Sequence, residues 1–394
     1  SETHELSSRT STGAADWPSF GASCGIILFV CVPLAVFPEA GGRLLERTYS
    51  LVAAEFGFAY LMAGCLAVSI LVWLAFGRHG RVVLGAANEP PEFSTYSWIA
   101  MVFCAGIGAG LLAWAPVEWA HYFDTPPFGV MPRSDEATAW ASTYGLFHWG
   151  PTAWAFYCLP TVAIAYPYYT KKLTYLRFST SCHYFLGKRE ESKIARVIDW
   201  LFTIALLGGA GSSLGFSTPL IAACISRLTG AEHQFGLEVF VVGLCVTLFA
   251  SSVWFGLEKG IKRLSDVNVL LALVLLLGML VIGPTVFLIK TSLNSVGLMF
   301  SQFLRMNSWT DPFSDSGFIE NWTVFYWAWW IAYGPFVGLF VTRISRGRTI
   351  RQVVTGMIGW GSLGTGVFFM IMGNYSLHLE LTGALSVTAS ASTC

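Results

Sequence analysis

Charged residues are scarce in this sequence. They make up 12% of the 394 residues, whereas 54% of the residues are hydrophobic. An average soluble domain is about 25% charged. The 23 Lys and Arg residues are balanced by 23 Asp and Glu residues. The net charge leaves no large positively charged surface, so we do not expect nucleic acid as a partner. Lipid is the expected solvent of so apolar a chain.

Motifs for disulfides, metals and catalysis are also missing. The nine cysteines include no CxxC pair and lie mostly inside apolar blocks, so we interpret them as small buried hydrophobic residues. His148 has no Cys, Asp or Glu close to it in the sequence. We therefore expect no enzyme, no bound metal and no cofactor. Residues 1–19 are polar and lack the apolar core of a signal peptide, so the first apolar block should be retained.

Long apolar blocks dominate what is present. They are long enough to cross a hydrocarbon core of roughly 30 Å as helices. We count nine, near residues 20–38, 50–77, 97–123, 140–168, 198–226, 238–256, 268–289, 321–342 and 353–374. With a cytoplasmic N-terminus, 17 of the 23 Lys and Arg residues fall in inner segments. The positive-inside rule therefore predicts this orientation in an inner or plasma membrane.

Two basic segments and one amphipathic segment lie between these blocks. Lys171 to Arg196 and Arg343 to Arg351 contain most of the inner positive charge. Their role in fixing the topology is a sufficient explanation, and contact with anionic lipids is an additional hypothesis. Val296 to Met306 is amphipathic, with Phe300 and Leu304 on its apolar side. It is predicted to lie as a helix along the outer membrane interface.

Glycine and proline interrupt two of the blocks. Gly106, Gly108 and Gly110 alternate in the third block, and alternate residues of a helix point about 200° apart, so they cannot form one packing stripe. We predict an unwound helix there. The GxxxG spacing of Gly106 and Gly110 also fits ordinary small-residue packing. Gly334 and Pro335 predict a second interruption, in the eighth block.

The two interrupted blocks indicate the fold. Spans three and eight are five apart, and paired interruptions at matching positions are typical of an inverted repeat. The sequence therefore predicts an all-α membrane protein with a five-plus-five helix core. A core that starts at span three would end at span twelve, so we expect the second repeat to lack its last three helices.

This expectation divides the chain into five parts. Residues 1–19 form a cytoplasmic tail, and residues 20–95 form two additional N-terminal helices. The first five-helix repeat is expected in residues 96–292. Residues 293–320 form the outer interfacial helix and loop, and residues 321–394 form the start of the second repeat and a tail.

Tryptophan crowds the eighth block. Residues 322–333 contain four tryptophans. Trp322 fits the belt of aromatic residues at a membrane surface. Trp327, Trp329 and Trp330 lie more than a turn deeper, where each indole N–H needs a partner. Their number at this depth indicates a function other than interfacial anchoring.

The fourth block contains a matching aromatic set. Trp149, Trp154 and Tyr157 are spaced so that two turns of continuous helix would bring them near one face. Ring faces from two helices could enclose a quaternary ammonium, which offers no hydrogen bonds. Aromatic core packing is the alternative explanation.

Together, these motifs resemble a known family. Asn321 to Trp330, followed by Arg343 to Thr349, is similar to the signature of the betaine/carnitine/choline transporter (BCCT) family. The aromatic residues of the fourth block and the glycines of the third are similar to two further family motifs. The resemblance extends over all nine spans. It implies a ten-helix inverted-repeat (LeuT-like) fold preceded by two extra helices, usually assembled as a homotrimer.

The resemblance also implies the site residues. The family's aromatic box corresponds to Trp149, Trp154, Tyr157 and Trp330. The residues implied to line the paths to it are Trp329 and Tyr333 on the inner side and Trp327 on the outer side. The glycines implied to face the substrate are Gly106, Gly108 and Gly110. The implied ion-binding residues are Ala105, Gly108, Ser213 and Phe336.

Gly110 bears on the choice of substrate. The choline-carrying branch of the family places an acidic residue at this position, and here no counter-anion is offered. We interpret Glu118, the nearest acid, as an interfacial or packing carboxylate near the outer surface. A neutral box fits a zwitterion whose carboxylate faces free backbone N–H groups. We therefore expect import of a quaternary-ammonium zwitterion such as glycine betaine, for osmoprotection.

Sodium is the coupling ion that the resemblance implies. Of the family's sodium-site pattern in span five, only Ser213 is present. Other hydroxyls in this span are expected to bond to their own backbone. Asn268 stands where sodium-independent carnitine exchangers carry Arg, which favours ion coupling over exchange. The alternatives are a carrier of choline, carnitine or dimethylsulfoniopropionate with the same fold, and a non-transporting binding or osmosensing fragment.

Overall fold

Helices make up all the regular structure in the described part of the chain. The computed structural model describes residues 17–106, 108, 110–171, 176, 178–182, 193–232, 234–256, 260–314 and 316–391. Within these residues, β pairing is limited to one isolated antiparallel bridge between Val83 and Thr349. The predicted all-α class is therefore confirmed for this part. Most of the N-terminal tail 1–19 and most of the basic segment Lys171 to Arg196 lie outside the described residues.

Among the described residues, six helical runs are long and apolar enough to cross a membrane. They are α2 (Pro38–Phe76), α10 (Lys193–Thr229), α11 (Phe235–Trp254), α12 (Lys262–Ile282), η5 with α14 (Ile319–Ile344), and α15 with η6 and α16 (Ile350–Leu381). The sequence predicts nine spans, and the first, third and fourth of these do not meet the same requirement. The first, α1 (Trp17–Val36), is a shorter apolar helix, and the other two are broken.

Each of the two broken spans consists of two helices. The third consists of α3 (Thr95–Gly106) and α4 (Gly110–Trp114). The fourth consists of α6 (Asp135–His148) and α7 (Pro151–Thr170). The remaining elements are the 24-residue helix α13 (Thr285–Ser308) and the short elements η1 (Arg78–Arg81), α5 (Glu118–Asp124), η2 (Pro127–Gly129), α8 (Phe178–Ser181) and α17 (Val387–Ala391).

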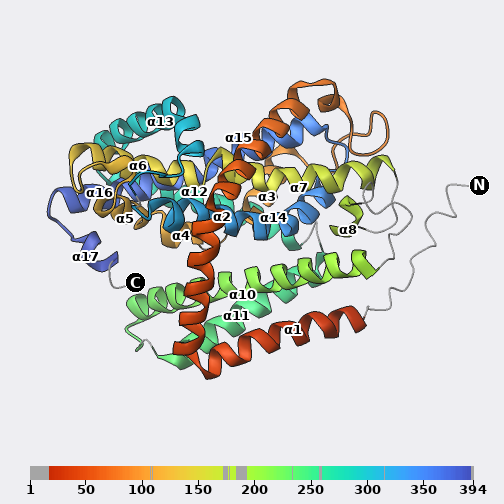
Figure 1. The fold of residues 1–394 in the computed structure, drawn as a ribbon, viewed down its shortest axis with the longest axis horizontal. Helices are drawn as coiled ribbons and strands as arrows, with labels where there is room; N and C mark the ends of the chain where they lie inside the picture. The colour runs from red at the N-terminus through yellow and green to blue at the C-terminus, as the bar shows by residue number, and fades with distance from the viewer. Residues whose placement is uncertain are drawn as a thin grey trace, which may run out of the picture.

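The helices form two layers that α2 connects. In Figure 1, α1, α10 and α11 lie side by side in the lower layer, and α3, α7, α12, α14 and α15 lie in the upper layer. The buried core is in the upper layer, where α7 packs along α14. Glycines allow this close approach: a Cβ atom on Gly334 would lie 2.8 Å from the Phe156 carbonyl oxygen, and one on Gly338 would lie 3.0 Å from the Thr161 nitrogen.

The predicted interruption at Gly334 and Pro335 is wrong. The helix α14 runs without a break from Phe325 to Ile344 and includes Pro335. A proline removes one backbone donor, and in packed membrane helices neighbouring groups compensate for that loss. The irregular part lies earlier, in the π-helix η5 (Ile319–Val324). Only one of the two expected interruptions is therefore present, and the inverted repeat stays an expectation that the family resemblance carries.

The amphipathic segment forms a longer helix than predicted. The helix α13 spans 24 residues and includes the predicted stretch. Phe300 and Leu304 are exposed, whereas Met299 and Met306 are buried against the core. The predicted helix is confirmed, and the location of α13 along the outer membrane interface stays a prediction.

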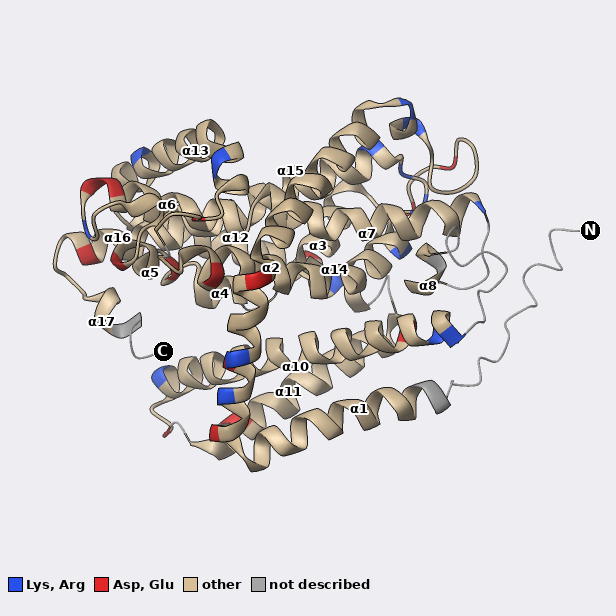
Figure 2. Cartoon of the chain, in the orientation of Figure 1, with Lys and Arg blue, Asp and Glu red and all other residues tan. Residues whose placement is uncertain are grey.

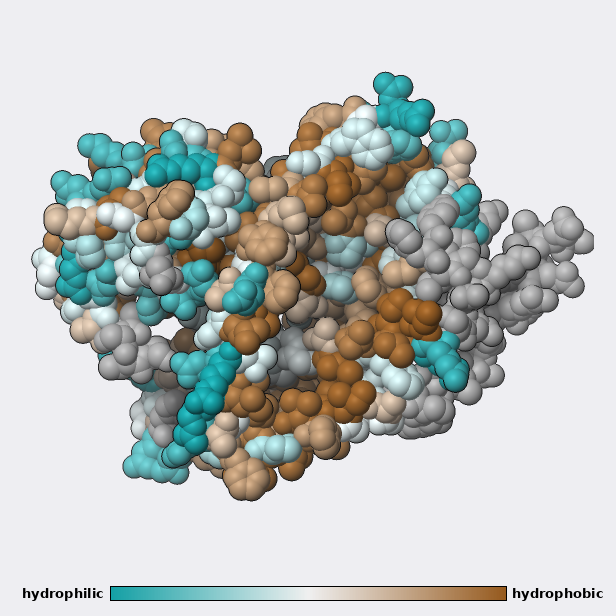
Figure 3. Space-filling view, in the orientation of Figure 1, coloured by the Kyte–Doolittle hydropathy of each residue, from teal (hydrophilic) through white to brown (hydrophobic). Residues whose placement is uncertain are grey.

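Charge and hydropathy are distributed as in a membrane protein. Figure 2 shows most charged residues near the ends of the long helices, with few in the helix middles. Large apolar side chains are exposed on the outward faces of α10, α11 and α12, and Figure 3 shows extensive hydrophobic surface on this side of the molecule. These faces suit a hydrocarbon solvent.

Candidate functional site

The break in the third span lies against aromatic rings. The helix α3 ends at Gly106, α4 begins at Gly110, and Gly108 between them is not helical. A Cβ atom on Gly106 would lie 2.9 Å from the Trp154 ring, and one on Gly110 would lie 3.6 Å from the Trp329 ring. The predicted unwinding is confirmed at these glycines; Ile107 and Ala109 lie outside the described residues.

The fourth span is also broken, which the sequence argument missed. Trp149 follows the last residue of α6, and Gly150 is non-helical with φ −98° and ψ −144°. A Cβ atom on Gly150 would lie 2.1 Å from the Leu146 carbonyl oxygen. The expectation that one continuous helix carries Trp149 and Tyr157 is therefore wrong. Gly150 and Pro151 end one helix and start the next.

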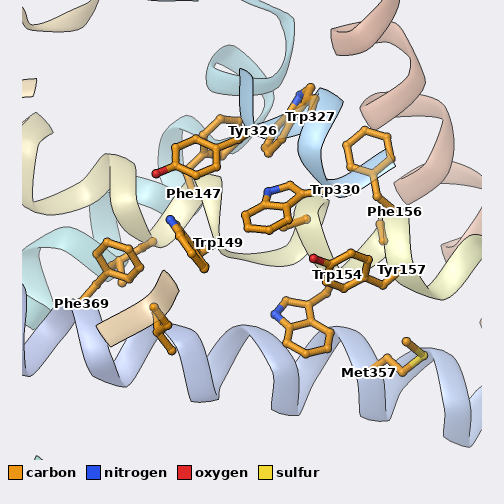
Figure 4. Packing of buried hydrophobic residues seen from close by; sticks show 14 of the residues in the cluster. Phe147, Trp149, Trp154, Phe156, Tyr157, Tyr326, Trp327, Trp330, Met357 and Phe369 are labelled. Carbon is orange, nitrogen blue, oxygen red and sulfur yellow. The ribbon is translucent and has the colours of Figure 1, made fainter. Parts of the chain in front are cut away.

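The break nevertheless brings the four predicted box residues together. The Trp330 ring of α14 lies 4.9 Å from the Trp149 ring and 5.8 Å from the Tyr157 ring, measured between centroids. Tyr157 lies 5.7 Å from Trp154 at an interplanar angle of 90°. All four side chains are at most 2% exposed. Figure 4 shows Trp330 between Trp149 and the pair formed by Trp154 and Tyr157.

The residues predicted to line the inner path lie between α14 and α10. The Trp329 ring stacks on Trp330 at 4.9 Å and lies 6.4 Å from Phe216 of α10. Tyr333 lies 6.4 Å from Tyr157 and close to Gly209 of α10. Both side chains are partly exposed, as a path leading to the box requires.

Trp327 is placed elsewhere, between α2 and α7. Its ring lies 5.6 Å from Phe156 and 5.3 Å from Phe147. A Cβ atom on Gly64 of α2 would lie 3.4 Å from its Nε1 atom. Trp327 is fully buried in this packing. Its predicted role at the outer approach has no support from this position.

Glu118 is not near the surface, contrary to our interpretation of the sequence. It is 0% exposed. Its Oε2 atom accepts hydrogen bonds from Trp149 Nε1 at 2.8 Å and from Tyr326 Oη at 2.5 Å. Its Oε1 atom accepts one from Tyr122 Oη at 2.5 Å. The sequence argument counted helical turns onward from Gly110, whereas the turn after Trp114 redirects the chain and aims Glu118 inward.

His148 belongs to the same buried network. Its Nδ1 atom lies 2.8 Å from Tyr122 Oη and 3.9 Å from Glu118 Oε1, and its Nε2 atom lies 3.1 Å from Thr323 Oγ1. Glu118 is 30 positions before His148 in the sequence, which is why a search for neighbouring acids missed the pair. The backbone carbonyl of His148 also accepts a hydrogen bond from Trp330 Nε1 at 2.9 Å.

Two polar atoms of the box lack a hydrogen-bond partner among the described residues. They are Trp154 Nε1 and Tyr157 Oη, and both are buried. The other two indoles of the box are satisfied by Glu118 and by the His148 carbonyl. Buried donors are nearly always hydrogen-bonded in native proteins. The pair is therefore open to a hydrogen-bond acceptor, as are Trp327 Nε1 and Tyr144 Oη, which lack a partner among the described residues as well.

The structure adds residues of α15 and η6 that the sequence analysis did not identify. A Cβ atom on Gly361 would lie 2.2 Å from Trp154, so this glycine makes room for the indole. Thr365 Oγ1 donates to the Trp149 carbonyl at 2.7 Å, and the Phe369 ring lies 5.8 Å from the Trp149 ring. Only the lack of a side chain at Gly361 could have indicated such a contact in advance.

The four residues implied to bind an ion are spread over three helical segments. Ala105 and Gly108 belong to the broken third span, Ser213 to α10, and Phe336 to α14. The Gly108 carbonyl accepts a bond from the Leu111 N–H at 3.2 Å. The Ser213 carbonyl accepts a bond from Ser217 Oγ at 2.7 Å, which fits the expectation that hydroxyls here bond to their own backbone. The ion site itself stays a prediction.

Comparisons with known proteins identify the family. The chain matches BCCT, the betaine/carnitine/choline family transporter, over residues 18–393. The uncharacterised transporter YeaV of Escherichia coli (strain K12) is 38% identical over 322 residues, which cover 82% of this chain and 66% of YeaV. A carnitine transporter of Acinetobacter baumannii (strain ATCC 19606) is 34% identical over 363 residues, which cover 92% of this chain and 66% of that protein.

The two matches each cover slightly less than two thirds of the relative's length. The family match, by contrast, covers nearly all of this chain. It agrees with the apolar helices, the broken third span and the buried aromatic set. The chain therefore belongs to the betaine/carnitine/choline family of transporters.

Proposed function

We propose that the protein is a secondary transporter that imports a small quaternary-ammonium zwitterion such as glycine betaine. The observation that carries this proposal is the set of rings formed by Trp149, Trp330, Tyr157 and Trp154 beside the glycine break. Three of the rings come from residues 149–157, and the fourth comes from α14, which is far away in the sequence. A trimethylammonium group offers no hydrogen bonds and is stabilised by ring faces.

The free donors of the box support a ligand that also carries a carboxylate. Trp154 Nε1 and Tyr157 Oη are buried without a partner among the described residues. A carboxylate would accept hydrogen bonds from both, and charge-assisted bonds of this kind are stronger than neutral ones. The ring faces and these donors together fit a zwitterion, whereas choline offers them only one neutral hydroxyl oxygen as an acceptor.

Glu118 weakens the argument that the site lacks a negative charge to balance choline. Gly110 provides no counter-anion, but the Glu118 carboxyl group lies directly behind Trp149. An acidic group there favours any cationic headgroup, including that of choline. Discrimination between choline and betaine therefore rests on the free donors and no longer on the absence of an acid.

Carnitine is the second candidate substrate. A relative that is 34% identical is named a carnitine transporter. Carnitine has the same trimethylammonium and carboxylate groups as glycine betaine but a longer spacing between them. Competition of unlabelled carnitine, choline and betaine against labelled betaine uptake separates these candidates. We also propose sodium coupling, a homotrimeric assembly and a cytoplasmic N-terminus, as the family resemblance implies.

Radiolabelled uptake in a transporter-deficient bacterium tests the proposed function. Trp330→Ala removes the ring that contacts both Trp149 and Tyr157. A cation–π contact at a desolvated site contributes about 2 kcal/mol, so we expect the KM for betaine to rise roughly thirty-fold. Trp254→Ala, which removes an exposed indole of α11, is the matched control.

The control variant should keep wild-type uptake at equal expression. Uptake by Trp330→Ala that equals that of the wild type would reject the box as the substrate site. Complete absence of betaine and carnitine uptake by the wild-type protein would reject the proposed function.

A further inference from the structure

A buried acid is connected to the box through one indole. Glu118 Oε2 accepts hydrogen bonds from Trp149 Nε1 and Tyr326 Oη. The Trp149 ring contacts the Trp330 ring at 4.9 Å. Trp149 therefore binds the acid with its N–H group and forms a wall of the box with its ring. Any change in the charge of Glu118 acts directly on this wall.

A chain of hydrogen bonds leads away from the same acid. Tyr122 Oη lies 2.5 Å from Glu118 Oε1 and 2.8 Å from His148 Nδ1. His148 Nε2 lies 3.1 Å from Thr323 Oγ1. These four side chains are each 0% exposed. We name the chain Glu118–Tyr122–His148–Thr323 the buried relay.

The buried relay can hold one more proton without losing a hydrogen bond. With Glu118 ionised, Thr323 donates to His148 Nε2, His148 Nδ1–H donates to Tyr122, and Tyr122 donates to Glu118. With one proton added, every bond reverses. Glu118 donates to Tyr122, Tyr122 donates to His148 Nδ1, and His148 Nε2–H donates to Thr323. The relay then changes from one negative charge to neutral.

Other titratable groups face this region from several helices, and among them only Tyr144 and Tyr326 are as fully buried. Asp124 of α5 pairs with Arg133 at 2.7 Å in a partly exposed position. His121 of α5 is half-buried, with its ring 5.0 Å from Trp322. The remaining groups are Tyr144 of α6, Tyr326 of α14, Glu320 of η5 and Arg305 of α13. Arg305 lies over the Phe128 ring and is exposed.

We propose that the buried relay is a proton-binding site whose occupancy opposes binding of a cationic headgroup in the aromatic box. The ionised relay attracts the headgroup, and its hydrogen bond to the indole N–H makes the Trp149 ring face more negative. The protonated relay is neutral, so it does not attract the headgroup, and its carbonyl oxygen accepts a weaker hydrogen bond from the indole N–H. Because coupling between two sites is reciprocal, binding of the cation releases the proton. The identity of the cation rests on the proposed function, whereas the proton site follows from the relay itself.

Equilibrium binding to the purified protein in lipid nanodiscs tests this proposal. The probes are glycine betaine and choline, which do not titrate between about pH 5 and about pH 9. We expect the Kd of both to be roughly ten-fold higher at the acidic end, a usual size for coupling between two sites. Calorimetry in buffers of different ionisation enthalpy should detect release of up to one proton per ligand bound.

Glu118→Gln provides a sharp variant because glutamine reproduces the protonated relay. Its amide donates to Tyr122, and its carbonyl still accepts from Trp149 and Tyr326. We expect a Kd close to the acidic wild-type value at every pH, and no proton release. His121→Gln, on the same helix but outside the relay, should keep the pH dependence of the wild type.

Three results would overturn the proposal. The first is a wild-type Kd that does not change with pH, and the second is proton release that persists in Glu118→Gln. The third is absence of proton release by the wild type, a result that does not depend on the folding of any variant. If neither probe binds at any pH, the proposed function fails together with this proposal. Binding without pH dependence rejects the proton site alone.

Discussion

Trp330 is a single residue that contacts several parts of the candidate site. Its ring contacts Trp149 and Tyr157, and its indole N–H donates to the His148 carbonyl. The sequence predicted this residue through a family resemblance. It did not predict the network of Glu118, because two of the three hydrogen-bond partners of that acid are 31 and 208 positions away in the sequence. Contacts of this range do not appear as local spacing.

Tyr157→Phe separates the ring of this residue from its free hydroxyl. The variant keeps the ring contact with Trp330 and removes the unsatisfied Oη atom. A hydrogen bond to a charged group contributes about 1.5–3 kcal/mol, so the KM for glycine betaine should rise at least roughly ten-fold. The KM for choline, whose hydroxyl is a neutral acceptor, should rise much less.

Radiolabelled uptake of the two substrates measures this difference. Tyr166→Phe, on the exposed side of α7, is the matched control and should change neither value. An equal loss for betaine and choline would contradict the role of the hydroxyl as a carboxylate donor.

The breaks in the third and fourth spans position the residues of the box. The glycines of the third span correctly predicted a break, because three glycines so close together weaken a helix wherever they occur. The break in the fourth span, at Gly150 and Pro151, was not predicted, and the predicted break at Gly334 and Pro335 is absent. The same residue types end one helix and continue another, because neighbouring segments decide whether the free backbone groups find partners.

Gly106→Ala tests how closely the break fits the rings. The new Cβ atom would lie 2.9 Å from the Trp154 ring and 3.2 Å from the Tyr157 ring. Overpacking of this kind costs about 1–3 kcal/mol, so the thermal midpoint should fall by several degrees. Betaine uptake should fall as well, because both displaced rings belong to the box.

Gly278→Ala on α12, where a Cβ atom meets open space, is the control for this variant. Thermal unfolding followed by tryptophan fluorescence and uptake at equal expression provide the two measurements. A Gly106→Ala variant as stable and as active as the control would show that the glycine break and the rings do not pack as described.

At the scale of the whole molecule, the protein is a helical membrane protein. The composition and the long apolar blocks predicted this class. The count of nine spans was less secure, because hydropathy does not distinguish one long helix from two short helices joined by a break. Six helical runs satisfy a requirement of length and hydropathy, and two of the other predicted spans are broken. The orientation of the chain depends on the distribution of Lys and Arg and is open to a direct test.

Labelling of introduced cysteines by a membrane-impermeant thiol reagent tests the orientation. Lys171 and Ser308 are both exposed, and the positive-inside rule assigns them to opposite sides of the membrane. With the native cysteines replaced by serine, Ser308→Cys should react in intact cells. Lys171→Cys should react only after permeabilisation. The opposite pattern would invert the predicted topology.

The location of a bound ligand tests the assignment of the box most directly. We predict that an experimental structure of the protein with glycine betaine places the ammonium nitrogen within about 6 Å of the ring centroids of Trp149, Trp330 and Tyr157. The ligand carboxylate should lie within hydrogen-bond distance of Trp154 Nε1 or Tyr157 Oη. Betaine bound outside these rings, for example in the apolar hollow of about 370 Å³ lined by Leu288 and Met370, would contradict the assignment.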